Sequence, residues 1–278
     1  MTNHEGVSSE GALGSRVEVS HPDSIRIRLK IAYDGTAYAG WQVQKIGLGI
    51  QQLIETAIAK LFGLSLRIHG SSRTDTGVHA IGMVAHLDIP LYQWKMTPSK
   101  LVLALNANLP TDIRILGAGL CTSNFHARFD AKGKQYRYFV WNHPVAMPLL
   151  RSTTWHVPKP LDFSSMSQAS KFFIGTHDFK SFAANRSYEM ESNVRTLFRC
   201  SFHRRGSLLT FVMEGDGFLY KMCRGIVGTL VQVGLGKISP SEISNILDKK
   251  DRRIAGMNAP AHGLVLWRVF YRKRRKSI

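Results

Sequence analysis

Residues 25–33 constrain the fold more than any other segment, because apolar residues alternate there with basic ones. A two-residue period is that of a β-strand with one buried face. The buried face of this strand would hold isoleucine and leucine, and the other face would hold Arg26, Arg28 and Lys30. Similar segments predict further strands at 83–89, 112–118, 135–141, 195–203, 207–214 and 265–271.

Segments with helical spacing lie between these predicted strands. In residues 50–61 the apolar side chains fall on one helical face, and Gly63 is placed to end that helix. Thr97 and Pro98 have the chemistry of an N-cap and a first helical residue. Further helices are predicted at 162–174, at 217–233, and after the capping box Ser239–Glu242, with Pro240 at the first helical position.

Strands and helices interleave in both halves of the chain, which predicts an α+β fold of two related sheet-plus-helix halves joined near 119–130. We divide the chain into an N-terminal α+β subdomain at 24–120 and a C-terminal α+β subdomain at 121–278. Residues 1–23 are rich in Gly, Ser, Glu and His and have no sustained periodicity, so we expect a disordered N-terminal arm.

The charge balance gives the first indication of a partner. The chain has 37 Lys and Arg against 19 Asp and Glu, for a net charge of +18. An excess of this size favours a polyanion, either nucleic acid or an acidic membrane surface. A basic protein with a well-solvated surface is the alternative that composition alone leaves open.

The absence of targeting signals and the cysteine spacing argue against a membrane or secreted protein. The sequence has no run of about 18 apolar residues and no basic patch followed by an apolar stretch at its N-terminus. We therefore expect a soluble, cytoplasmic protein. Cys121, Cys200 and Cys223 are far apart and lack metal-ligand spacing, so we expect three buried, reduced thiols and no metal site.

The loop at 69–80 is the segment best suited to carry chemistry, because it is polar, flanked by glycines and set between a helix and a strand. Arg73 and Asp75 lie two residues apart, so a bend could bring the guanidinium beside the carboxylate and keep it ionised. The residues alone leave a simpler interpretation open, in which Asp75 only bonds the backbone of a turn.

The segment Ser72–Ala80 resembles the G-R-T-D-x-G-V-H-A motif of the TruA family of tRNA pseudouridine synthases. The other motifs that resemble this family occur in the family's order. They are Tyr33–Gln42, Phe125–Arg128, Lys134–Tyr138, Gly175–Phe182, Phe218–Leu230 and Ala259–Leu264. These matches extend over most of the predicted ordered chain.

The resemblance implies a role for four residues. Asp75 aligns with the essential catalytic aspartate, and Arg224 aligns with the arginine that pairs with it. Tyr136 aligns with the tyrosine that stacks on the target base and helps to remove the C5 proton. Arg73 aligns with the arginine that fills the gap left by the flipped uridine. Without the resemblance, Tyr136 could be an ordinary sheet aromatic and Arg224 the polar edge of a helix.

The resemblance also implies the fold, the substrate and the assembly. The fold would be a continuous, mainly antiparallel central sheet with helices packed on it. The reaction would isomerise uridine to pseudouridine in the anticodon stem-loop of tRNA, at positions 38, 39 and 40, by base flipping. Such an enzyme would need no cofactor and no metal, and would work as a homodimer.

Basic residues outside the catalytic set are candidate RNA contacts. Arg26, Arg28, Arg128 and the basic tail at 272–276 could bind phosphates. One departure from the family motif is Ser72, which stands where the family usually has glycine.

Two other functions remain as alternatives to the isomerase. A non-catalytic RNA-binding module or RNA chaperone would keep the charge but could dispense with Asp75. A carboxylate-based glycosidase or phosphodiesterase would need Asp34 as a second acid, which we instead expect to be a turn residue. We also expect His79 and His177 to be structural or to lie near the RNA.

Overall fold

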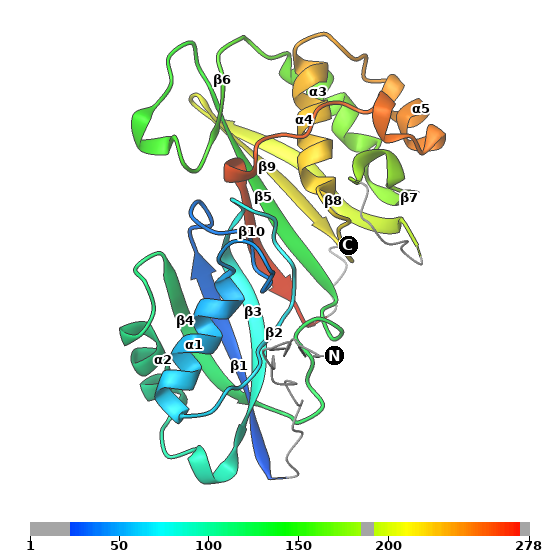
Figure 1. The fold of residues 1–278 in the computed structure, drawn as a ribbon. Coiled ribbons are helices and arrows are strands. Elements are labelled where there is room, and N and C mark those ends of the chain that lie inside the picture. Colours follow the sequence, from blue (N-terminus) through cyan, green and yellow to red (C-terminus); the bar gives the residue numbers. More distant parts are fainter. Residues whose placement is uncertain (1–22, 185–191, 273–278) are drawn as a thin grey trace, which may run out of the picture.

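The computed structural model describes residues 23–184 and 192–272 (Figure 1). The predicted N-terminal arm, apart from its last residue, and the basic tail beyond residue 272 lie outside the described residues. In the part of the chain that is described, no helix combines the length and apolar character needed to cross a bilayer.

Ten strands account for the β-structure of the described residues. They are β1 (Ser24–Tyr33), β2 (His69–Gly70), β3 (His79–Pro90), β4 (Ile113–Cys121), β5 (Gly133–Asn142), β6 (Trp155–Val157), β7 (Gly175–Asp178), β8 (Val194–Arg205), β9 (Leu208–Gly215) and β10 (Leu264–Phe270). They form one sheet in the order β4-β1-β3-β10-β5-β9-β8-β7, with β2 beside β3 and β6 beside β5. The pairs β3–β10 and β5–β6 are parallel and the others are antiparallel, which confirms the predicted mainly antiparallel sheet.

Five α-helices are described, and they cover the two halves of the sheet (Figure 1). They are α1 (Ile50–Phe62), α2 (Pro98–Ala107), α3 (Phe163–Lys171), α4 (Met222–Gly234) and α5 (Glu242–Lys249). Ile27, Leu29 and Ile31 of β1 are fully buried in the hydrophobic core, whereas Arg28 and Lys30 on the other face are exposed. The mixture of helices with a large sheet confirms the predicted α+β class.

Strand β10 joins the two halves of the sheet. It comes from the C-terminal end of the chain, yet it lies between β3 and β5. Leu266 pairs with Ala80 of β3 on one side and with Tyr136 of β5 on the other. This insertion brings the end of the loop at 71–78 within two strands of Tyr136. The division near residue 120 into two subdomains stays a prediction.

Local signals predict some helix ends and miss others. Gly63 caps α1 in the left-handed conformation, and the Thr97 side chain accepts a hydrogen bond from the Lys100 amide, as predicted. Helix α4 begins at Met222 and not near 217, because Lys221 has a φ of 60° and interrupts the helical backbone. Helix α3 ends at Lys171, three residues earlier than predicted.

The capping box and one cysteine also differ from prediction. Glu242 accepts a hydrogen bond from the Ser239 amide at 2.6 Å, as in a capping box, but the Ser239 hydroxyl bonds to the Ser241 hydroxyl instead of the helix backbone. Helix α5 begins at Glu242, so Pro240 lies before the helix and not at its first position. Cys200 and Cys223 are buried as expected. The prediction for Cys121 is wrong, because this residue ends edge strand β4 and is only half-buried.

Candidate active site

The loop at 71–78 is anchored on both sides of Asp75. The hydroxyls of Thr74 and Tyr33 share a buried hydrogen bond of 2.7 Å, and the Trp41 amide donates to the Thr74 carbonyl at 3.1 Å. The Val78 amide donates to the Asp75 carbonyl at 3.1 Å and closes the turn. These bonds fix the backbone of Asp75, so the direction of its side chain is set by the scaffold and not by the loop alone.

Gly40 allows the 33–42 segment to pack against this loop. Its φ is 97°, a conformation that residues with a side chain rarely adopt. A Cβ atom at this position would lie 2.5 Å from the Thr74 carbonyl oxygen, so the two backbones could not approach as they do. The Y-D-G-T-x-Y-x-G-W-Q segment therefore supports the loop at 71–78.

Arg224 faces Asp75 from the first turn of α4. Its Nη1 atom lies 3.6 Å from Oδ2 of Asp75, and the two side chains are 15% and 16% exposed. Its Nε atom donates to the Ala259 carbonyl at 2.7 Å, which fixes the guanidinium. A positive charge this close favours the ionised carboxylate over the neutral acid in a site that is shielded from water.

Tyr136 projects from β5 toward the same site and is buried. Its ring meets that of Phe218 edge to face, with the centroids 5.0 Å apart. Burial raises the pKa of Tyr136 well above its usual range, and the negative charges that Cys223 and Asp75 would carry raise it further. The phenol is therefore protonated at neutral pH and suits stacking or hydrogen bonding better than it suits a phenolate base.

Ser72 introduces a polar group beneath this site. Its hydroxyl is buried and has no hydrogen-bond partner among the described residues. It nonetheless lies close enough to Tyr136 to offset part of the rise in that residue's pKa. The serine is accommodated in place of the family's glycine without any positive φ, because Ser72 is not among the described residues with such a backbone.

The four residues predicted to act on the uridine differ in how close they lie to one another. Asp75 and Arg224 form a pair, and Tyr136 is close enough for the Asp75 charge to affect its pKa. Arg73 is exposed at the loop, two residues from Asp75, so its side chain is available to a ligand outside the protein. The loop alone does not predict that the Ala259 carbonyl would hold Arg224, although the A-P-A-x-G-L motif marks that segment.

The predicted phosphate contacts lie elsewhere, in different environments. Arg26 donates to both carboxylate oxygens of Asp88, at 2.7 and 2.6 Å, and to the Phe125 carbonyl at 2.8 Å. A phosphate contact by Arg26 would therefore have to compete with an existing ion pair. Arg28 is exposed on the same sheet face, which is opposite to the face that carries Tyr33. Arg128 is exposed in the loop before β5, with its guanidinium over the Phe129 ring.

His79 and Asp34 have structural surroundings. His79 is buried, accepts the Gly35 amide at Nδ1, and has its Nε2 atom 3.0 Å from the carbonyls of Ser152 and His262. Asp34 accepts the Thr36 amide at 2.9 Å, as expected of a turn residue. Within residues 23–184 and 192–272, no group of three His, Cys, Asp or Glu is arranged to hold a metal ion.

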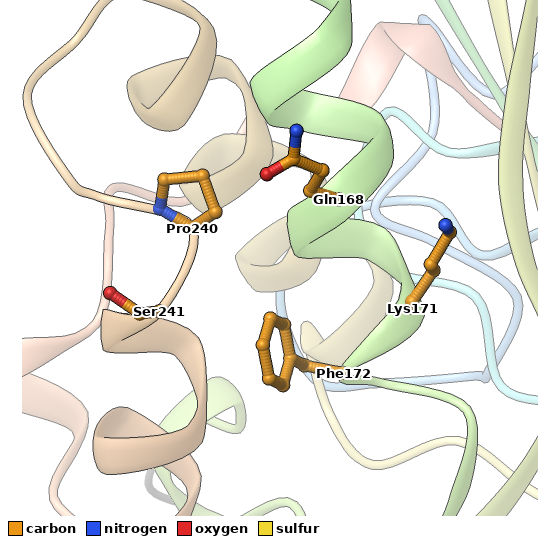
Figure 2. Close-up of a pocket in the computed structure, with 5 residues that line it drawn as sticks. All are labelled: Gln168, Lys171, Phe172, Pro240 and Ser241. Carbon is orange, nitrogen blue, oxygen red and sulfur yellow. The ribbon is translucent and has the colours of Figure 1, made fainter.

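A surface pocket lies apart from these residues. It has a volume of about 410 Å³ and sits between α3 and the turn before α5 (Figure 2). Its lining consists of Gln168, Lys171, Phe172, Pro240 and Ser241. None of the residues predicted for catalysis or RNA binding lines this pocket.

Comparison with known proteins places these features in a family context. A family model described as tRNA pseudouridine synthase matches residues 30–130 and 169–272. The tRNA pseudouridine synthase A of Acetivibrio thermocellus is 44% identical over 245 residues, covering 88% of this chain and 99% of that protein. The enzyme of the same name from Geobacillus kaustophilus is 44% identical over 252 residues, covering 88% and 94%. That from Exiguobacterium sibiricum is 41% identical over 253 residues, covering 91% and 99%.

Proposed function

The chain belongs to the tRNA pseudouridine synthase family, and we propose that it isomerises uridine to pseudouridine in the anticodon stem-loop of tRNA. The observation that carries this proposal is the approach of Arg224 to Asp75, at 3.6 Å, beside the buried ring of Tyr136. The three side chains come from a loop, a helix and a strand that are far apart in sequence. A binding module without catalysis would have no need of this arrangement.

The first step is extrusion of the target uridine. A base inside a stem is out of reach of a buried carboxylate, and unstacking it costs a few kcal/mol. Arg73 is exposed in the loop at 71–78 and can enter the gap that the base leaves. Its planar guanidinium can stack on the neighbouring bases while its charge stays near the phosphates.

The reaction then replaces the bond between the ribose and N1 of uracil with a bond between the ribose and C5. The N1–C1′ bond breaks, the uracil ring turns, C5 bonds to C1′, and the proton on C5 is transferred to N1. The product is an isomer of the substrate, so the reaction needs neither an oxidant nor an energy source. Asp75 acts on the ribose or the base while the glycosidic bond is open, and Arg224 keeps the carboxylate anionic in a site with little water.

Tyr136 provides the surface on which the extruded uracil rests. Its ring is held against Phe218, and burial raises the pKa of its phenol. A protonated phenol can donate a hydrogen bond to a uracil oxygen or relay a proton from C5, and its ring can stack on the base. We therefore assign Tyr136 to base positioning, with proton transfer as a secondary role.

We propose that the enzyme works as a homodimer in the cytoplasm, where its tRNA substrate would be present. The support for a dimer is the sheet face opposite the helices. There Arg137 lies 3.9 Å above the Trp267 ring, Phe139 packs near the same ring, and Phe198 is 46% exposed. Partly exposed aromatic residues with arginine are typical of protein interfaces.

The test uses unmodified tRNA tritiated at uridine C5. The wild-type chain should release tritium, whereas Asp75→Asn should bind tRNA and release essentially none. Asp248→Asn, at an exposed aspartate of α5, is the matched control and should behave as wild type. Binding without release by the wild-type chain would favour the RNA-binding module and refute the isomerase.

A further inference from the structure

Lys134 lies on the same strand as Tyr136 and has no role in the mechanism above. It is on β5, two residues before Tyr136, so both side chains project from the same face about 6.6 Å apart along the strand. Its neighbour on β9 is Gly215, which has no side chain to cover the amine. Lys134 is half-buried, next to Tyr136 on that face of the strand.

One arginine projects from the same sheet face as Lys134. Arg195 is on β8, two residues before Leu197, and Leu197 pairs with Gly215, so Arg195 and Lys134 project from the same face. Its side chain lies against Gly217, close enough that a Cβ there would be 3.3 Å from its Nε atom. Burial, together with the positive charges of Arg128 and Arg195, lowers the pKa of Lys134 to about 8.

The carboxylates next to these cations in sequence accept hydrogen bonds from amide groups. Glu214 accepts a hydrogen bond from Gln135 at 2.6 Å, and both residues project from the opposite face of the sheet. Asp216 accepts the Thr196 amide at 3.0 Å. Asp130 accepts the His126 amide at 2.8 Å. Lys134 and Arg195 thus project from one face of the sheet. Arg195 also donates from Nη1 to the Ser192 carbonyl at 3.0 Å, and the acids next to both cations in sequence bond elsewhere.

We propose that Lys134 and Arg195, flanked by Arg128, bind a backbone phosphate of the RNA next to the extruded nucleotide. The proposal rests on the proposed function, because it is the tRNA that brings a phosphodiester to this face of the sheet. A phosphate between these side chains would supply the missing negative charge and would fix the ribose of the uridine that stacks on Tyr136.

The proposal has a signature in pH. A bound phosphate favours the charged amine, so the pKa of Lys134 must be higher in the complex than in the free protein. The free protein loses this proton as the pH rises through about 8, and affinity falls with it. Because one proton is involved, the loss of affinity between pH 7 and pH 9 is at most about tenfold.

The experiment measures binding of an unmodified tRNA transcript to full-length protein in the Asp75→Asn background, where no turnover occurs. Lys134→Met should weaken binding about five- to tenfold and make the slope of log affinity against log salt shallower by about 0.7–0.9, the value for one phosphate contact. Lys249→Met, at an exposed lysine of α5, is the control and should leave both quantities unchanged. An unchanged salt slope for Lys134→Met would overturn the proposal.

Lys134→Arg gives a second and independent outcome, which holds even if Lys134→Met does not fold. Arginine keeps its charge throughout this pH range, so the variant should retain affinity and lose the component of the pH dependence that Lys134 causes. A pH profile identical to that of wild type would overturn the phosphate site. Because affinity is measured without turnover, failure of the isomerase assay would leave this result intact.

Discussion

Replacing Arg224 with methionine tests the electrostatic role of its guanidinium. At an effective dielectric constant of about 20, two unit charges 3.6 Å apart attract by about 4–5 kcal/mol. Because the side chains are 15% and 16% exposed, solvent screens part of this attraction, and we expect a net loss of about 2–3 kcal/mol. If that loss falls on the chemical step, kcat drops about 30- to 160-fold.

The assay is single-turnover tritium release with saturating tRNA, so that weaker binding does not enter the rate. Arg224→Lys keeps the charge but loses the planar donor to Ala259, and should retain more activity than Arg224→Met. Arg205→Met, at an exposed position of β8, is the control. A folded Arg224→Met variant within threefold of the wild-type rate would refute the electrostatic reasoning.

Four other perturbations follow from the contacts of the site and the sheet. Gly40→Ala should lower both the melting temperature and the rate of tritium release, because its Cβ would clash with the Thr74 carbonyl; unchanged values would contradict the packing described. Tyr136→Phe should retain more activity than Tyr136→Ala if stacking is the main role of the ring, and equal losses would favour the hydroxyl. Arg26→Met should lower the free energy of unfolding, measured by urea denaturation, by about 1–3 kcal/mol because the ion pair with Asp88 is lost. If the variant also makes the slope of log affinity for tRNA against log salt shallower, Arg26 contacts a phosphate as well. Burial and the neighbouring charges lower the pKa of His86 to about 4, so the unfolded chain binds a proton at this residue first as the pH falls. The free energy of unfolding should therefore decrease by at most about 3 kcal/mol from about pH 6.5 to pH 4. The His86→Gln variant should show a smaller decrease.

Much of the fold follows from local chemistry that the sequence displays. The alternation in 25–33 predicts the buried and basic faces of β1, and Gly63 and Thr97 predict ends of α1 and α2. Each of these signals acts within a few residues. The start of α4 is missed because Lys221 adopts a left-handed backbone that only the tertiary structure can hold in a non-glycine residue.

The candidate site is harder to predict, because it depends on long-range pairing. Asp75 and Tyr136 approach each other only since β10 inserts between β3 and β5, and no local pattern specifies that insertion. Resemblance to a family supplies the residues and their roles. It does not predict that Arg26 forms an ion pair with Asp88, or that Lys134 and Arg195 project from the same face of the sheet.

A crystal structure of the Asp75→Asn variant bound to unmodified tRNA tests the central claim most directly. We predict a uridine turned out of the anticodon stem-loop, with its ring on Tyr136, its C1′ atom beside residue 75, and Arg73 in the vacated stack. A uridine still paired in its helix, or an extruded base bound away from residue 75 and Tyr136, would contradict the mechanism.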